Sequence, residues 1–158
     1  MRLTMLLPFA AFALAACASA PAATNSSVTR VVSTTSFGMC VGYCTTRLEI
    51  SEGQAVLIRE ARAGRGGGGP VQDTQRFTAP LTPSEWQEIQ RLAANVDFDA
   101  LPDTVGCPDC ADGGAEGLTV EGPGGAESVS LEFRATIPQA QPLLDRVRAL
   151  RERLTPQE

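Results

Sequence analysis

Two close pairs of cysteines are the residues of this 158-residue chain whose type and spacing most directly suggest chemistry. Cys40 and Cys44 form the first pair, and Cys107 and Cys110 form the second, within the sequence VGCPDCADGGAE. Close pairs of cysteines are typical of disulfides, of redox centres and of zinc sites. These three chemistries require different surroundings, so the neighbouring residues help to choose among them.

A reactive redox centre is disfavoured by the acids around the second pair. Reactive thiols have lowered pKa values, which helix N-termini and nearby cations provide. Here four acidic side chains lie between residues 103 and 116, and their charge disfavours a thiolate. The flanking pattern is also not strand–helix–strand. A periplasmic thiol-redox protein that uses Cys107 and Cys110 is therefore kept as an alternative function.

A zinc site formed by all four cysteines is the second alternative. Two close pairs can supply four thiolates in a tetrahedral arrangement. However, the first pair has an unusual three-residue gap, and residues 45–106 separate the two pairs. An exported protein must also acquire its zinc before oxidants join the thiols. We therefore predict no cofactor, with zinc at Cys40, Cys44, Cys107 and Cys110 as the less favoured interpretation.

Disulfide bonds are the predicted state of Cys40, Cys44, Cys107 and Cys110. An even number of cysteines in an oxidising compartment favours pairing, although three connectivities are open. Local bonds are preferred, because each pair lies in a segment that contains Gly or Pro. Residues four apart in a straight strand lie roughly 13 Å apart, so a Cys40–Cys44 bond requires a turn. Gly42 permits such a turn.

Acidic residues of the second cysteine segment could instead bind a metal. Asp109, Asp112 and Glu116 could offer oxygens to calcium, with Gly113 and Gly114 allowing the backbone to fold round the ion. Their spacing does not match the EF-hand loop. The preferred interpretation is a solvated acidic loop.

The residue types that are missing restrict the function further. The chain contains no His, and all 13 of its basic residues are Arg. The commonest general base, Ser-His and Cys-His pairs, Ser-Lys dyads and Schiff-base chemistry are thereby excluded. Any catalysis would depend on carboxylates, thiols or Tyr43. We therefore predict a non-enzymatic protein, with a carboxylate-based hydrolase as a further rival.

The N-terminus has the layout of an export signal. Arg2 precedes an apolar run, residues 3–16, that is too short to span a bilayer. The sequence LAAC, Leu14–Cys17, resembles the bacterial lipobox. That resemblance implies cleavage before Cys17 and lipid on its thiol and its new amine. We expect a signal peptide at residues 1–16, and lipidated Cys17 with a flexible tether at residues 17–27.

The lipobox resemblance also implies a location. Cys17 is followed by Ala18 rather than Asp, which by analogy with enterobacterial lipoproteins favours the outer membrane, facing the periplasm. Two or three acyl chains anchor stably, since each buried methylene adds about 0.8 kcal/mol. A plain secreted protein is the alternative. The net charge of −5 disfavours nucleic acid. The expected partners are the membrane, through the anchor, and an envelope protein.

Alternation of apolar and polar residues predicts several strands. Leu48 and Ile50 alternate with polar residues, and Val56 and Ile58 continue the pattern after the turn-forming SEGQ. This arrangement predicts a hairpin with one buried face. Further strands are expected at residues 28–36, 75–80, 117–122 and 127–134.

Two helices are predicted by apolar residues at helical spacing. In the first, Thr82, Pro83 and Glu85 form a capping box with proline in the first turn, and the apolar stripe consists of Trp86, Ile89, Leu92 and Val96. The second lies within residues 138–154, with the stripe Leu143, Val147, Leu150 and Leu154. Its four arginines are expected to form a solvated rim near the helix C-terminus: Arg146, Arg148, Arg151 and Arg153.

These elements predict an α+β fold for residues 28–158, organised as a single disulfide-stapled domain. Its expected form is an antiparallel β-sheet of hairpins with two helices packed on one face.

The sequence FGMCVGYC, followed by a predicted hairpin, resembles the opening of an uncharacterised domain family of exported bacterial proteins. Members show a Cys-Phe-Gly-x-Cys-Pro motif before such strands, and CPDCADGGAE followed by a strand is similar to a second family feature. The resemblance spans residues 29–154. In this chain Val41 replaces the aromatic residue of the motif and Thr45 replaces its proline. The resemblance implies that the four paired cysteines belong to a shared scaffold, and it implies no activity.

Overall fold

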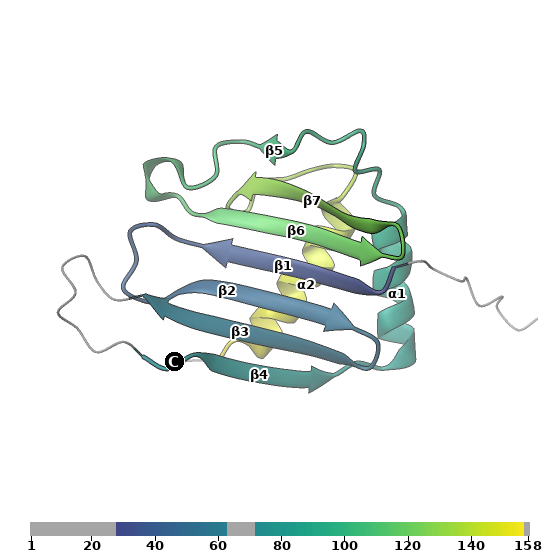
Figure 1. Ribbon diagram of the computed structural model, residues 1–158, viewed down its shortest axis with the longest axis horizontal. Coiled ribbons are helices and arrows are strands. Elements are labelled where there is room, and N and C mark those ends of the chain that lie inside the picture. Colours follow the sequence, from purple (N-terminus) through teal and green to yellow (C-terminus); the bar gives the residue numbers. More distant parts are fainter. Residues whose placement is uncertain (1–27, 63–71, 157–158) are drawn as a thin grey trace, which may run out of the picture.

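The computed structural model describes residues 28–62 and 72–156. These residues form a mixed fold of a seven-stranded, mostly antiparallel sheet and two helices (Figure 1). The predicted combination of a sheet with two helices is therefore confirmed. The predicted signal peptide, the proposed lipidation site Cys17 and the tether at residues 17–27 lie outside the described residues.

The order of the strands in the sheet is β4-β3-β2-β1-β6-β7-β5. Neighbouring strands are antiparallel, except that the short β5 runs parallel to β7. Two helices and one turn of 3-10 helix, η1, complete the described chain. The elements are β1 Arg30–Ser36, β2 Gly42–Ser51, β3 Gln54–Arg62, β4 Gln75–Pro80, α1 Pro83–Ala94, β5 Thr104–Val105, η1 Cys110–Asp112, β6 Ala115–Gly122, β7 Gly125–Glu132 and α2 Gln141–Leu154.

The buried face of the sheet follows from the alternation in the strands. Leu48 pairs with Leu57, and Ile50 pairs with Ala55, across the β2–β3 ladder. All four side chains are fully buried, while the intervening residues of β2 remain partly or fully exposed. Because successive side chains of a strand point to opposite faces, one face of the sheet carries this apolar set. The prediction that Val56 and Ile58 continue the buried face is therefore wrong, since they pair with Glu49 and Arg47 on the other face.

Both helices lie behind the sheet in Figure 1, against that apolar face. The N-terminus of α1 has the predicted capping box, in which Thr82 and Glu85 each bond to the other's backbone N–H. Trp86, Ile89 and Ala93 are the buried residues of α1. In α2 the buried residues are Leu143, Leu144, Val147 and Leu150. Removing each large apolar side chain from water contributes about 1.5–3 kcal/mol.

The two ends of the sheet differ. The described chain starts at the end where α1 packs, and α2 crosses the middle of the sheet (Figure 1). The opposite end carries two segments that contain Cys40, Cys107 and Cys110, and Cys44 follows the first of them in β2. We call these segments the first cysteine loop, residues 37–41, and the second cysteine loop, residues 106–114.

Two short elements were not predicted. Thr104 and Val105 form β5 by pairing with Ser130 and Leu131 of β7, and η1 lies inside the second cysteine loop. Both are too short to show a periodic pattern. Within residues 28–62 and 72–156, neither helix has the length and apolar character needed to cross a membrane.

Candidate functional site

The paired cysteines are joined locally, within each loop region. Cys40 bonds to Cys44 and Cys107 bonds to Cys110, with Cα–Cα distances of 5.5 Å and 5.4 Å. Both distances lie in the usual range for disulfides. Cys44 is buried, whereas Cys107 and Cys110 are exposed. The four cysteines therefore form two separate staples and are not gathered round one centre.

A turn and a bulge close the first disulfide. Gly42 has a φ of +91°, a left-handed conformation that glycine adopts without strain. The β2–β3 register then shifts between Tyr43 and Thr45, which leaves Cys44 as an extra residue in β2. A bulge of this kind redirects the side chain of the inserted residue. Gly42, the residue identified from the sequence, thus lies at the turn that brings Cys44 back to Cys40.

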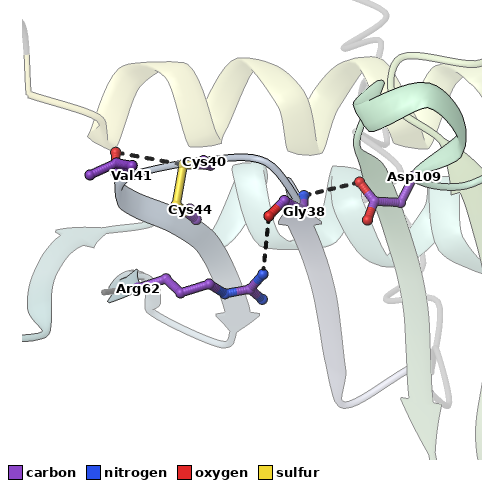
Figure 2. The surroundings of a disulfide bond; sticks show 6 residues. All are labelled: Gly38, Cys40, Val41, Cys44, Arg62 and Asp109. Atoms are coloured by element: carbon purple, nitrogen blue, oxygen red, sulfur yellow. Dashed lines mark hydrogen bonds between the residues drawn. A yellow bond between two sulfur atoms is a disulfide. The ribbon is translucent and has the colours of Figure 1, made fainter. Parts of the chain in front are cut away.

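A side chain from the second cysteine loop binds the first loop (Figure 2). The backbone N–H of Gly38 donates to Asp109 Oδ1 at 3.0 Å, and the carbonyl of Gly38 accepts from Arg62 Nη1 at 3.5 Å. A Cβ at Gly38 would approach Asp109 Oδ2 to 2.6 Å, so a larger residue there would displace the Asp109 side chain. Asp109 is therefore a link between the two loops in addition to being an exposed acid.

The first cysteine loop presents apolar side chains to solvent. Met39 is 60% exposed and Val41 is 82% exposed, and they flank Cys40. Beside them lies a surface hollow of about 510 Å³ that is also lined by Arg62, Asp109 and Asp112. Disulfide and hydrogen bonds hold the loop that carries these two side chains, so they form a fixed apolar projection at the cysteine end.

The structure corrects the interpretation of Glu116. The sequence grouped this residue with Asp109 and Asp112, as a calcium ligand or part of a solvated acidic loop. Glu116 instead belongs to β6, where its side chain is completely buried and faces α2. The alternation of β6 explains this placement, because Glu116 shares a face with Leu118 and Val120.

The predicted solvated rim of α2 is wrong for Arg148 and Arg151, because both contact the buried carboxylate. Arg148 Nη2 donates to Glu116 Oε2 at 2.7 Å, and Arg151 Nη1 donates to Oε1 at 3.1 Å. Arg148 also donates to the carbonyl of Ala135 at 2.9 Å, and Arg151 donates to Ser33 Oγ. Glu116, Arg148 and Arg151 form what we call the buried charge cluster.

The other two arginines of that rim link the helices. Arg146 and Arg153 both donate to Glu85 Oε1 at 3.3 Å, and Arg146 Nε lies 3.3 Å from Glu88 Oε2. Arg153 is about half exposed and Arg146 is mostly covered. The prediction of a solvated rim therefore describes Arg153 better than Arg146.

Burial and charge oppose each other within the buried charge cluster. Burial alone would raise the pKa of Glu116, but the hydrogen bonds and charges of Arg148 and Arg151 outweigh it, so the pKa lies below its ordinary value of 4.5. Burial lowers the pKa of Arg151, and Glu116 only partly compensates. The cluster contains two guanidiniums and one carboxylate, so its net charge is +1.

The buried charge cluster borders a hollow of about 750 Å³, which we call the α2 hollow. Its walls are formed by the ends of β1, β2 and β6 on one side and by α2 on the other. Thr35 and Thr46 lie at its sheet side, with their hydroxyl oxygens 2.6 Å apart. Phe37 and Phe133 form an apolar wall, with ring centroids 4.8 Å apart and an edge-to-face arrangement. Polar, charged and aromatic groups thus meet in one cavity.

Metal binding receives no support from the arrangement of candidate ligands. Among the described residues, no three His, Cys, Asp or Glu side chains are grouped so that they could hold a metal ion. The four cysteines proposed for zinc are divided between the two staples. The calcium ligands proposed from the sequence are not brought together, because Glu116 is paired with arginine.

The buried charge cluster was missed because its members lie far apart in the sequence. Arg148 and Arg151 are 32 and 35 residues from Glu116. One local signal was available: Glu116 continues the alternation of Leu118 and Val120 toward the N-terminus.

Comparison with known proteins assigns no family or function to the chain, since no protein-family model matches it and no curated protein matches it.

Proposed function

We propose that this chain is a lipid-anchored, non-enzymatic binding module of the bacterial cell envelope, attached to the outer membrane and facing the periplasm. The LAAC sequence with Cys17 supports the anchor. Membership of the exported family with the Cys-Phe-Gly-x-Cys-Pro motif is part of this proposal, and the local Cys40–Cys44 bond within CVGYC supports it.

The placement of the two cysteine loops is the observation that supports a binding function. The described chain begins at one end of the sheet, and the two cysteine loops lie at the other end (Figure 1). Exposed Met39 and Val41 stand at this distal end, on a loop fixed by the first disulfide. A domain attached through Cys17 would therefore present its apolar projection away from the lipid surface, where an envelope protein can contact it.

The anchor is tested by metabolic labelling of the full chain in an exporting bacterium. Wild-type protein is expected to incorporate labelled palmitate and to sediment with outer membranes. The Cys17→Ser variant should incorporate no label. Equal labelling of the two proteins, or wild-type protein in the soluble periplasmic fraction, would contradict the anchor.

The binding surface is tested by crosslinking in the same cells. A photoreactive amino acid is placed at Val41 in one protein and at Glu52, an exposed residue of the β2–β3 turn at the opposite end, in the control. We expect a discrete crosslinked product from position 41 and not from position 52. Identical products from both positions would show that the cysteine end is not the contact surface.

A further inference from the structure

The α2 hollow joins two properties that are common in small-molecule sites. Its volume of about 750 Å³ lies within the range of roughly 300–1,000 Å³ that ligand pockets occupy. Its lining combines apolar surface from Phe37, Phe133 and Ala149 with a few charged groups. Pockets that orient a ligand have this composition, because apolar walls provide contact area and polar groups provide direction.

The charge at the inner part of the hollow is positive. The side chains of Arg148 and Arg151 are only 17% and 11% exposed, and Glu116 between them is fully buried. One carboxylate neutralises only one of the two guanidiniums. Burial magnifies the remaining charge, because a low dielectric screens it poorly. An anion that entered the hollow would complete the neutralisation.

An unused hydrogen-bond donor among the two arginines also favours an anionic ligand. The Nε–H of Arg151 is buried and has no hydrogen-bond partner among residues 28–62 and 72–156. Arg148 uses Nε and Nη2 in its hydrogen bonds to Glu116 and Ala135. Its Nη1 is not used in these bonds. Because this Nε–H of Arg151 has no surface open to the hollow, the donor that remains for a ligand oxygen is Nη1 of Arg148.

The remaining charges lie at the rim of the hollow. Arg134 and Glu152 pair with each other at 3.5 Å and are both about 70% exposed. Asp145 is exposed and accepts from Gln141 Nε2 at 2.7 Å. Solvent screens such exposed charges. The rim therefore offsets the positive inner part only weakly.

From these observations we infer that the α2 hollow binds a small carboxylate with an apolar body, with its carboxylate at Arg148 and Arg151 and its body against Phe37 and Phe133. A carboxylate would accept a charge-assisted hydrogen bond from the unused Nη1 of Arg148 and would balance the second guanidinium charge. The same chemistry is present in a free organic acid and in the C-terminus of a peptide. This inference does not depend on the lipid anchor or on the apolar projection.

The first test compares acids with their uncharged amides by titration calorimetry. The full chain in detergent is titrated with 3-phenylpropionate and with 3-phenylpropanamide, and protein-free micelles give the blank. The acid is expected to bind about tenfold or more tightly than the amide, as the loss of a charge-assisted hydrogen bond implies. A short peptide ending in phenylalanine, with a free or amidated C-terminus, shows which source of carboxylate binds better.

A pair of variants locates the site without altering the buried charge cluster. Ala149 is exposed on α2 and lines the hollow, so Ala149→Trp should fill the cavity and weaken binding of the acid about tenfold or more. Ala94→Trp makes the same change at an exposed position of α1 outside the hollow and should leave the affinity unchanged. Arg148→Gln should also abolish the preference for acid over amide.

Two results would overturn the inference. One is the absence of tighter binding by the acids, seen as equal affinity for acid and amide or as no binding heat with 3-phenylpropionate and with the free-carboxyl peptide. The other is an equal effect of Ala149→Trp and Ala94→Trp. Because Ala149→Trp removes no contact of the cluster, the comparison of the two tryptophan variants decides the matter even if Arg148→Gln fails to fold.

Discussion

Glu116 depends on Arg148 and Arg151 for its charge, since its side chain has no contact with solvent. Replacing buried ion pairs by apolar groups is often neutral, but removing one partner leaves an uncompensated charge. The two guanidiniums would keep their positive charges if the carboxylate were removed. Stability is therefore more sensitive to Glu116 than to any exposed acid that forms a surface pair.

Glu116→Gln is expected to lower the free energy of unfolding by about 3–5 kcal/mol. Glu152→Gln is the matched control, because Glu152 pairs with Arg134 at the exposed rim, where loss of a surface pair costs about 0–1 kcal/mol. Urea unfolding of both variants measures the difference. Equal destabilisation by the two substitutions would show that the buried charge cluster contributes no more than a surface pair.

The lowered pKa of Glu116 predicts acid sensitivity. A carboxyl whose pKa is lower in the folded state stabilises the protein above its unfolded pKa, and this stability is lost as the pH falls through the folded pKa. For Glu116 the loss begins as the pH falls below its ordinary pKa of 4.5. Urea unfolding at about pH 7 and about pH 3 should show a smaller acid loss in Glu116→Gln than in wild type. An identical loss in both proteins would exclude this contribution.

At the scale of elements, Glu85 at the start of α1 takes part both in the helix cap and in contacts with α2. The backbone N–H and hydroxyl of Thr82 donate to Glu85, and with Arg153 they lower the pKa of Glu85 to about 2. Arg146 of α2 also donates to Glu85. The same carboxylate thus caps one helix and ties it to the other.

Thr82→Ala should lower the free energy of unfolding by about 1 kcal/mol, because alanine has no hydroxyl to accept the hydrogen bond from the backbone N–H of Glu85. Thr82→Ser keeps the hydroxyl and should cost little. The contribution of Glu85 should be complete above its ordinary pKa of 4.5 and should disappear as the pH falls through about 2. Thermal unfolding of the two variants measures the cap, and equal midpoints would contradict it.

The two staples close short loops and should stabilise the domain modestly. Replacing both Cys107 and Cys110 by Ala should cost about 2 kcal/mol in the loop-entropy model. Replacing both Cys40 and Cys44 should cost more, because the buried side chain of Cys44 is also truncated. Urea unfolding of the two double variants ranks the staples. A larger loss from the second pair would show that burial of Cys44 is not the deciding difference.

At the scale of the whole molecule, local patterns predicted most of the elements. Most of the predicted stripes of α1 and α2 are buried, because helical periodicity depends only on backbone geometry, although Leu92 and Leu154 are only partly buried. The alternation identified the core face of β2 but not that of β3, where the residues that face the core are offset by one position from Val56 and Ile58. β5 was missed because two residues show no period. The buried charge cluster was missed because its pairing depends on where α2 crosses β1 and β6, which no local pattern contains.

The order of the strands also decides which features lie at which end of the domain. β1 runs from the end at which the described chain begins to the first cysteine loop, and β6 starts just after the second loop (Figure 1). Both staples, the apolar projection and the α2 hollow consequently lie at the cysteine end. An N-terminal anchor would place all of them away from the lipid.

The most direct test of the anchored, stapled module is the intact mass of the full chain after expression in an exporting bacterium, with and without alkylation in the absence of reductant. We predict a chain that begins at Cys17, carries diacylglycerol and an acyl chain, is four hydrogens lighter than its reduced form and gains no alkyl groups. A soluble product cleaved elsewhere and without lipid would contradict the anchored module. Alkylated thiols would contradict the two staples and favour a redox role for Cys107 and Cys110.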